Sequence, residues 1–69
     1  MVNYKITIEA TFTNGNSTHD VIEADNEINA NAIFEKFVSF VKESDSKINS
    51  AYIMLYNCKT RNMINRFVL

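Results

Sequence analysis

Residues 2 to 13 alternate strictly between two kinds of side chain, and this alternation constrains the fold more than any other feature of the sequence. The even-numbered positions carry Val2, Tyr4, Ile6, Ile8, Ala10 and Phe12, and the odd-numbered positions are polar. Such a period of two indicates a strand with one buried face. Asn14-Gly15-Asn16 follows, and these residue types tolerate the positive φ of hairpin turns. The sequence therefore predicts a β-hairpin whose return strand covers residues 17 to 24.

The length of the hairpin loop decides which side chains of the return strand face the core. A two-residue loop places the charged Glu23 opposite Ile6. A three-residue loop, Asn14 to Asn16, instead places Ala24 opposite Ile6 and Ile22 opposite Ile8. We favour the three-residue loop because it puts apolar residues in the core. The other face then receives His19, Val21 and Glu23.

One amphipathic helix is expected after the hairpin. Asp25 or Asn26 is suited to cap its first turn, and Glu27 lies where the helix dipole favours an anion. With 100° per residue, one stripe collects the apolar side chains Ala30, Ile33, Phe34, Phe37, Phe40 and Val41, with Val38 at its edge. The pattern predicts a helix of about 16 to 18 residues that ends near Ser44 to Ser46.

The last third of the chain predicts a second hairpin. Residues 51 to 58 are apolar in both parities, which is typical of a strand whose two faces both need cover. Thr60-Arg61-Asn62 is the expected loop, and residues 63 to 69 form the closing strand. The expected pairs are Leu55 with Phe67 and Ile53 with Leu69 on the core side, and Met54 with Val68 and Tyr56 with Arg66 on the opposite side.

The order strand, strand, helix, strand, strand predicts an α+β fold. A right-handed crossover through the helix is met by a four-stranded antiparallel sheet in the order 2-1-3-4, with one helix packed on one face (ββαββ). A chain of 69 residues holds one hydrophobic core, so residues 1–69 are expected to form a single domain. Its 46% of apolar residues is too many for a disordered segment.

Catalysis and cofactor binding are not expected. Cys58 and His19 are the only residues of their types, too few for an internal disulfide or a zinc site, and one glycine makes no phosphate-binding loop. His19 and Asp20, as strand neighbours, should point to opposite faces. We expect no enzymatic activity, no cofactor and no metal. Without a long apolar run or a basic, apolar leader, we also expect no membrane contact and a cytoplasmic location.

Charge is distributed unevenly along the chain. Residues 1 to 45 carry all eight acidic side chains, whereas residues 46 to 69 carry Lys47, Lys59, Arg61 and Arg66 and no acid. Such asymmetry marks either a basic surface for nucleic acid or complementary patches for association with protein. Four basic residues in a chain of net charge -1 are few beside typical nucleic-acid binders.

The sheet face away from the helix is the most informative surface. It is expected to gather Tyr52, Met54, Tyr56, Ile64, Val68 and Val21, rimmed by Lys5, Thr7, Glu9 and Arg66. Aromatic, Met and Arg side chains on an apolar patch are typical of protein interfaces. The predicted partner-binding residues are therefore Tyr52, Met54, Tyr56, Ile64, Arg66 and Val68, and the predicted partner is a host protein or a second copy in a homodimer.

Single-stranded nucleic acid is the alternative partner. Tyr52 and Tyr56 would stack bases on the open face, and Lys5, Lys59, Arg61 and Arg66 would hold phosphates. The overall acidity of the chain makes this the less favoured hypothesis.

Ala24-Asp25-Asn26-Glu27, entering a helix after an Asn-Gly hairpin with Ala30 six positions after Ala24, resembles a pattern in small phage and mobile-element proteins. Similar strand-rich chains with a single helix include a short phage-encoded inhibitor of bacterial RNA polymerase and several anti-CRISPR proteins. The resemblance covers residues 4 to 40 and carries over no functional residue. It implies a non-enzymatic inhibitor or regulator that binds a host protein.

Overall fold

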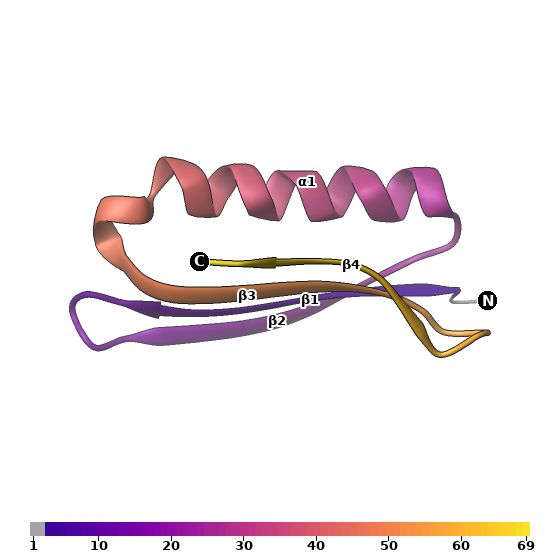
Figure 1. Cartoon of the computed structure of the whole chain (residues 1–69), viewed down its shortest axis with the longest axis horizontal. Helices are drawn as coiled ribbons and strands as arrows, with labels where there is room; N and C mark the ends of the chain where they lie inside the picture. The colour runs from indigo at the N-terminus through magenta and orange to yellow at the C-terminus, as the bar shows by residue number, and fades with distance from the viewer. Residues whose placement is uncertain (1–2) are drawn as a thin grey trace.

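The structure is a computed structural model that describes residues 3–69, and it shows one helix lying along one face of a sheet (Figure 1). The elements are β1 (Tyr4–Phe12), β2 (Ser17–Ala24), α1 (Glu27–Glu43), the 3-10 turn η1 (Asp45–Lys47), β3 (Ile48–Asn57) and β4 (Asn62–Val68). The sheet order is β2-β1-β3-β4 and every neighbouring pair is antiparallel. The predicted α+β fold, ββαββ with sheet order 2-1-3-4, is confirmed. The predicted inward position of Val2 lies outside the described residues.

Helix α1 begins and ends as the sequence predicts. The Asn26 side chain accepts a 2.8 Å hydrogen bond from the Asn29 N–H, which satisfies one free donor of the first turn. At the other end the Ser44 N–H donates to the carbonyl of Phe40. Glu27 in the first turn and Lys42 in the last both complement the helix dipole.

The core lies between α1 and the two central strands. It consists of Ile6, Ile8 and Ala10 on β1, Ile48, Ala51, Ile53 and Leu55 on β3, Ala30, Phe34, Val38 and Val41 on α1, and Ala24 at the end of β2. Ile6, Val41, Ile53 and Leu55 are fully buried. The helix therefore covers β1 and β3 and leaves the two outer strands less protected.

This placement corrects the predicted core at three positions. Val38, expected at the edge of the apolar stripe, is buried, whereas Phe40 is 46% exposed. Ile22, expected in the core, is 37% exposed. The exposure of Phe40 and Ile22 has one cause: α1 packs over β1 and β3, so the helix-facing side of the outer strand β2 is only partly covered. Phe40 lines an open hollow together with Thr18 and Asp20 of that strand. The amphipathic pattern of a helix does not report what surface the helix meets.

In the first hairpin the predicted residues lie on each face of the sheet, but the two strands pair in a different register. Ile6 pairs with Ile22 and Ile8 with Asp20, so the predicted pairs are wrong by two residues. The Phe12 N–H donates to the Asn16 carbonyl over 2.7 Å, which makes residues 13–15 the three-residue loop. Gly15, with φ of 91°, is the last residue of this loop, where the chain needs a positive φ after a type I turn. The prediction placed this glycine in the middle of the loop.

In the second hairpin the predicted residues of β3 and the end of β4 also lie on the predicted faces, although the pairing is shifted by two residues. Ile53 pairs with Phe67 rather than Leu69, and Met54 pairs with Arg66 rather than Val68. The loop has four residues, 58–61, instead of the three predicted, because Asn57 pairs with Asn62. Arg61, the last loop residue, takes a positive φ of 60°, as Gly15 does in the first hairpin.

A bulge in β4 reconciles this even-numbered loop with the burial pattern. Tyr56 pairs with Met63 and Leu55 pairs with Asn65, so Ile64 is the extra residue. Without a bulge, every residue beyond Met63 would shift by one position and change faces. The bulge thus keeps Phe67 on the helix side, where the Lys42 ammonium lies 5.8 Å from the centre of its ring.

Strand β3 begins three residues before the predicted start at Ala51. Ile48 is buried and pairs with Phe12 beyond a bulge at the end of β1. The Thr13 N–H donates to the Lys47 carbonyl, which ties the first loop to the short turn η1. The polar residues around Ile48 concealed this start.

Candidate functional site

The sheet face opposite α1 carries a row of large side chains on β3. Tyr52, Met54 and Tyr56 alternate with the buried residues of the same strand, and each is half-buried. On β4, Val68 lies opposite Tyr52 and Arg66 lies opposite Met54. We call these five residues the β3–β4 patch. An antiparallel sheet with a helix on only one side leaves such a face open.

The structure brings five of the six predicted partner-binding residues together in this patch. The sixth, Ile64, is the extra residue of the bulge. Met63, not Arg66 as predicted, lies opposite Tyr56, and it is 42% exposed. Sequence reasoning missed Met63 because the bulge, which places it on this face, has no signal in the residue pattern.

Val21 is separated from the β3–β4 patch. It lies opposite Thr7 on the central strand β1, and Thr7 lies opposite Met54 on its other side. Lys5 and Glu9, which were expected at the rim, also lie on β1, each between a residue of β2 and a tyrosine of β3. A polar line therefore divides the open face: β3 and β4 carry its apolar area, and Val21 stands alone on the outer strand.

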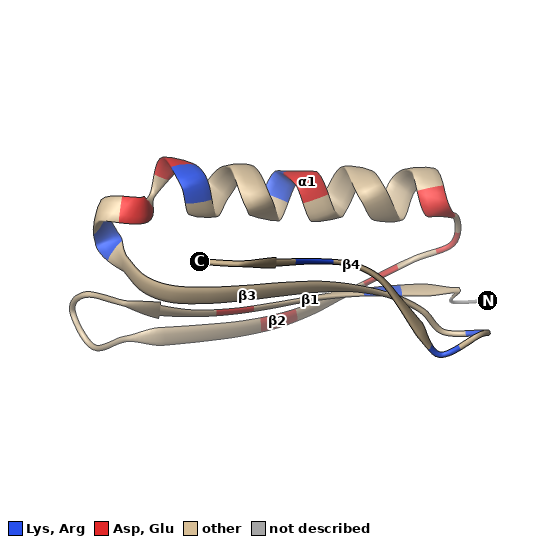
Figure 2. Cartoon of the chain, viewed as in Figure 1, with Lys and Arg blue, Asp and Glu red and all other residues tan. Residues whose placement is uncertain are grey.

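Basic side chains gather at one end of the patch. Lys5 and Arg61 line a hollow of about 410 Å³ together with Tyr56 and Cys58. Figure 2 shows basic residues at the β3–β4 turn and on β4, and acidic residues on β1, β2 and the connection to the helix. The charge asymmetry of the sequence thus becomes a positive end beside the aromatic row.

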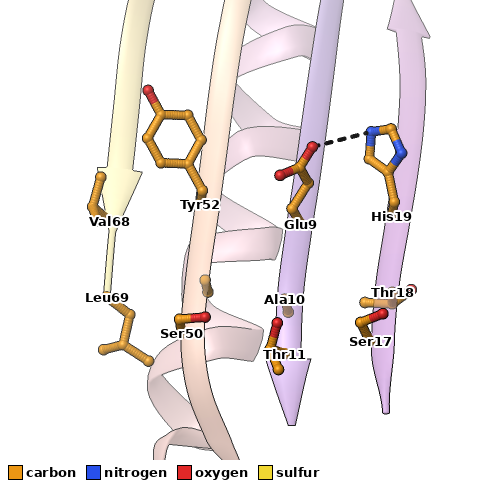
Figure 3. Close-up of a pocket in the computed structure, with 11 residues that line it drawn as sticks. Glu9, Ala10, Thr11, Ser17, Thr18, His19, Ser50, Tyr52, Val68 and Leu69 are labelled. Atoms are coloured by element: carbon orange, nitrogen blue, oxygen red, sulfur yellow. Dashed lines mark ion pairs between the residues drawn. The ribbon is translucent and has the colours of Figure 1, made fainter. Parts of the chain in front are cut away.

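A second hollow of about 430 Å³ lies at the other end of the open face (Figure 3). Val68, Tyr52, Glu9 and His19 form one row across the four strands, and the small side chains of Ser50, Thr11 and Ser17 form the next. His19 Nε2 lies 3.7 Å from Glu9 Oε1, and both side chains are more than half exposed. The predicted register hid this pair, since it placed Val21 opposite Glu9.

The second hollow has no activated nucleophile among residues 3–69. Thr11, Ser17 and Ser50 supply hydroxyl groups, but none of the hydrogen bonds within this range joins a hydroxyl to His19. Catalysis by a serine or threonine needs such a bond, to a base that a third group orients. The geometry offers a surface depression with one exposed ion pair.

Metal ligation finds equally little support. The described part of the chain holds no cluster of three or more His, Cys, Asp or Glu side chains that would hold an ion. Cys58 is half-buried, and its backbone N–H donates to the Asn3 carbonyl over 2.8 Å. In residues 3–69, α1 is too short and too polar for a bilayer crossing, and no other helix approaches the required length.

Comparison of this chain with protein-family models, with curated proteins and with solved structures finds no match.

Proposed function

We propose that this chain is a non-enzymatic protein-binding module that docks another protein on the β3–β4 patch. One observation carries the proposal: Tyr52, Met54 and Tyr56 form a row of large side chains on a sheet face that the helix does not cover. The neighbouring Val68 is 59% exposed. A partner would remove this apolar area from water without rearranging the sheet.

The residue types of the patch support binding to protein. Tyrosine, methionine and arginine are enriched in protein interfaces, and tyrosine and arginine most often carry a large share of the binding energy. Strand residues already fixed by the sheet lose little conformational freedom on binding. Tyr52 and Tyr56, on the central strand β3, are therefore the expected anchors.

The charges around the patch define the chemistry of the partner. Lys59, Arg61 and Arg66 belong to a hairpin without any acidic residue. We expect a partner surface whose centre is apolar and whose rim presents carboxylates to these side chains. Complementary charge of this kind mainly raises the association rate and selects the partner.

The proposed role is that of an inhibitor or regulator that occupies a host protein's surface. This is how the phage-encoded and anti-CRISPR proteins that the chain resembles act. The proposed compartment is the cytoplasm, where a lone thiol such as Cys58 stays reduced.

The test begins with capture from a bacterial lysate and ends with purified proteins. A captured protein is purified and titrated against the wild type, Tyr52→Ala, Tyr56→Ala and Arg66→Glu. Each tyrosine variant should weaken binding by about tenfold or more, and Arg66→Glu should slow association. Ile28→Ala is the matched control, because Ile28 is an 82% exposed apolar residue on the helix side of the molecule.

Three outcomes contradict the proposal. In the first, every captured protein binds the tyrosine variants as tightly as it binds the wild type. In the second, the wild type captures no protein that the Tyr52→Ala/Tyr56→Ala double variant fails to capture. In the third, a single-stranded oligonucleotide binds at low ionic strength and is released by salt, which would assign the surface to nucleic acid.

A further inference from the structure

The outer edge of β2 presents a regular row of free backbone groups. The Phe12 N–H to Asn16 carbonyl bond fixes which pairs of this hairpin are hydrogen-bonded, and such pairs alternate along an antiparallel ladder. The even-numbered residues of β2 therefore turn their N–H and C=O groups toward β1. The groups of His19, Val21 and Glu23 turn outward. No register shift interrupts this strand.

We propose that β2 pairs antiparallel with β2 of a second copy of this chain, about a two-fold axis at Val21. Val21 then faces Val21 of the second copy, and each His19 faces the other copy's Glu23. All these residues have outward backbone groups, so each facing pair would exchange two hydrogen bonds. The two sheets would become one continuous sheet, with both helices on the same face.

Charge complementarity singles out the second copy as the occupant of this edge. On the open face of one chain, Glu9 lies opposite His19 and Lys5 lies opposite Glu23. Pairing about Val21 extends these neighbours into a row across the interface: Glu9 and His19 of one copy, then Glu23 and Lys5 of the other. Each acidic side chain has a basic neighbour when His19 is protonated. The two-fold axis generates the same row twice, with Val21, 50% exposed in the single chain, between them.

Neighbouring registers fit less well. An axis at Asp20 places the carboxylates of the two Asp20 residues directly opposite each other, which is destabilising. An axis at Ile22 shortens the overlap and moves His19 opposite Asp25, a residue beyond the end of β2. The Val21 register is the one that combines a long overlap with opposite charges.

The other outer strand is unsuited to the same pairing. The Leu69 N–H donates to the Ala51 carbonyl, so the outward backbone groups of β4 belong to Arg66 and Val68. The bulge at Ile64 interrupts the row, and bulges are a common protection of sheet edges. Symmetric pairing at Arg66 would bring two guanidinium groups together.

Sedimentation analysis of the full chain over a range of concentrations tests the dimer. Val21→Pro removes one outward N–H without a loss to the β1–β2 ladder, and it should weaken dimerisation by at least about tenfold. Val68→Pro makes the same change on the β4 edge and should leave the dimer intact. Circular dichroism of both variants checks that they fold. A wild type that stays monomeric up to millimolar concentration, or a dimer that withstands Val21→Pro, overturns the proposal.

A pair of charge variants tests the register. His19→Glu alone places carboxylates opposite the other copy's Glu23, and Glu23→Lys alone places an ammonium opposite the other copy's His19. Both homodimers should weaken. In a mixture, the heterodimer regains two complementary pairs and should exceed the statistical half of all dimers in native mass spectrometry. A statistical mixture would contradict the register.

Amide hydrogen exchange supplies a readout that needs no substitution. The amides of His19, Val21 and Glu23 should exchange slowly at dimer-forming concentrations and quickly on dilution, whereas the Val68 amide should exchange quickly at both. The Arg66 amide is not a useful probe, because it already donates to Asn65 Oδ1. Protection of the Val68 amide instead would place the contact on the other edge. The dimer does not rest on the proposed function: the β3–β4 patch stays free in it, and the tyrosine variants should dimerise like the wild type.

Discussion

The two hairpins share one plan and differ at their outer strands. In the first, β2 runs without interruption and keeps its backbone groups available along the edge. In the second, β4 carries the bulge at Ile64, and its Phe67 lies beneath the Lys42 side chain. The helix-facing Ile22 of β2 is open to water, whereas Phe67 of β4 packs against the core. The difference separates two kinds of contact: backbone pairing belongs to the first hairpin and side-chain docking to the second.

The comparison is tested most strongly by shortening one helix-facing side chain on each outer strand. Phe67 on β4 is half-buried and Ile22 on β2 is 37% exposed. Phe67→Ala should lower the free energy of unfolding by about 2 kcal/mol, less than for a fully buried phenylalanine. Ile22→Ala should cost less than about 1 kcal/mol, because water already reaches this residue.

Chemical denaturation of dilute protein, where the dimer is dissociated, measures both values. Ile6→Ala, at a fully buried position of β1, serves as the reference for a complete loss of packing. Equal costs for Phe67→Ala and Ile22→Ala would show that the helix protects the two outer strands alike.

The turn of the first hairpin depends on its glycine. Gly15 has a φ of 91°, and a Cβ at this position would meet no atom within 4 Å. Gly15→Ala should therefore destabilise the fold by roughly 1–2 kcal/mol through backbone strain alone. Thermal unfolding of this variant beside Thr13→Ala, an exposed neighbour in the same loop, isolates the effect. An unchanged melting temperature for Gly15→Ala would mean that the loop relaxes to another turn.

The turn of the second hairpin should respond in the opposite direction. Arg61 takes a φ of 60°, a conformation that side chains other than Asn, Asp and Gly rarely adopt. Arg61→Gly should raise the free energy of unfolding by up to about 1 kcal/mol, since glycine accepts this φ without strain. Arg61→Lys controls for the loss of the guanidinium group. A destabilising Arg61→Gly would show that the side chain contributes more than the strain removes.

The layers and the strand order follow from the sequence because they depend only on which alternate residues of each strand are apolar and on the order of the elements. The alternation on β1, the helical spacing and the crossover rule together determine which face is apolar and which strands are central. Register depends on the position of a single residue in a loop. Gly15 had to be the last loop residue, and Asn57 ends β3 by accepting from the N–H groups of Lys59 and Thr60. Neither detail alters the hydrophobic pattern.

The candidate site was predictable to the same extent. Tyr52, Met54 and Tyr56 share a parity, so their common face follows from strand geometry alone. The pair of Glu9 with His19 and the position of Met63 depend on register and on the bulge, and both escaped prediction. The free edge of β2 is a property of backbone direction, which side-chain patterns do not encode.

The smallest expected effect is a charge effect confined to the β2 edge. In the proposed dimer, residue 19 lies between Glu9 of its own β1 and Glu23 of the second copy. His19→Lys places a permanent positive charge between these two carboxylates. It should therefore raise the dimer affinity, by only a few-fold because side chains at this position are exposed.

Sedimentation of the wild type, His19→Lys and His19→Gln under the same conditions measures this effect. His19→Gln should keep the dimer, since its outward backbone groups are unchanged. A His19→Lys dimer that is weaker than the wild type would contradict the assigned neighbours of His19. A gain that persists when Glu23 is also replaced by Gln would place a different acidic group opposite position 19.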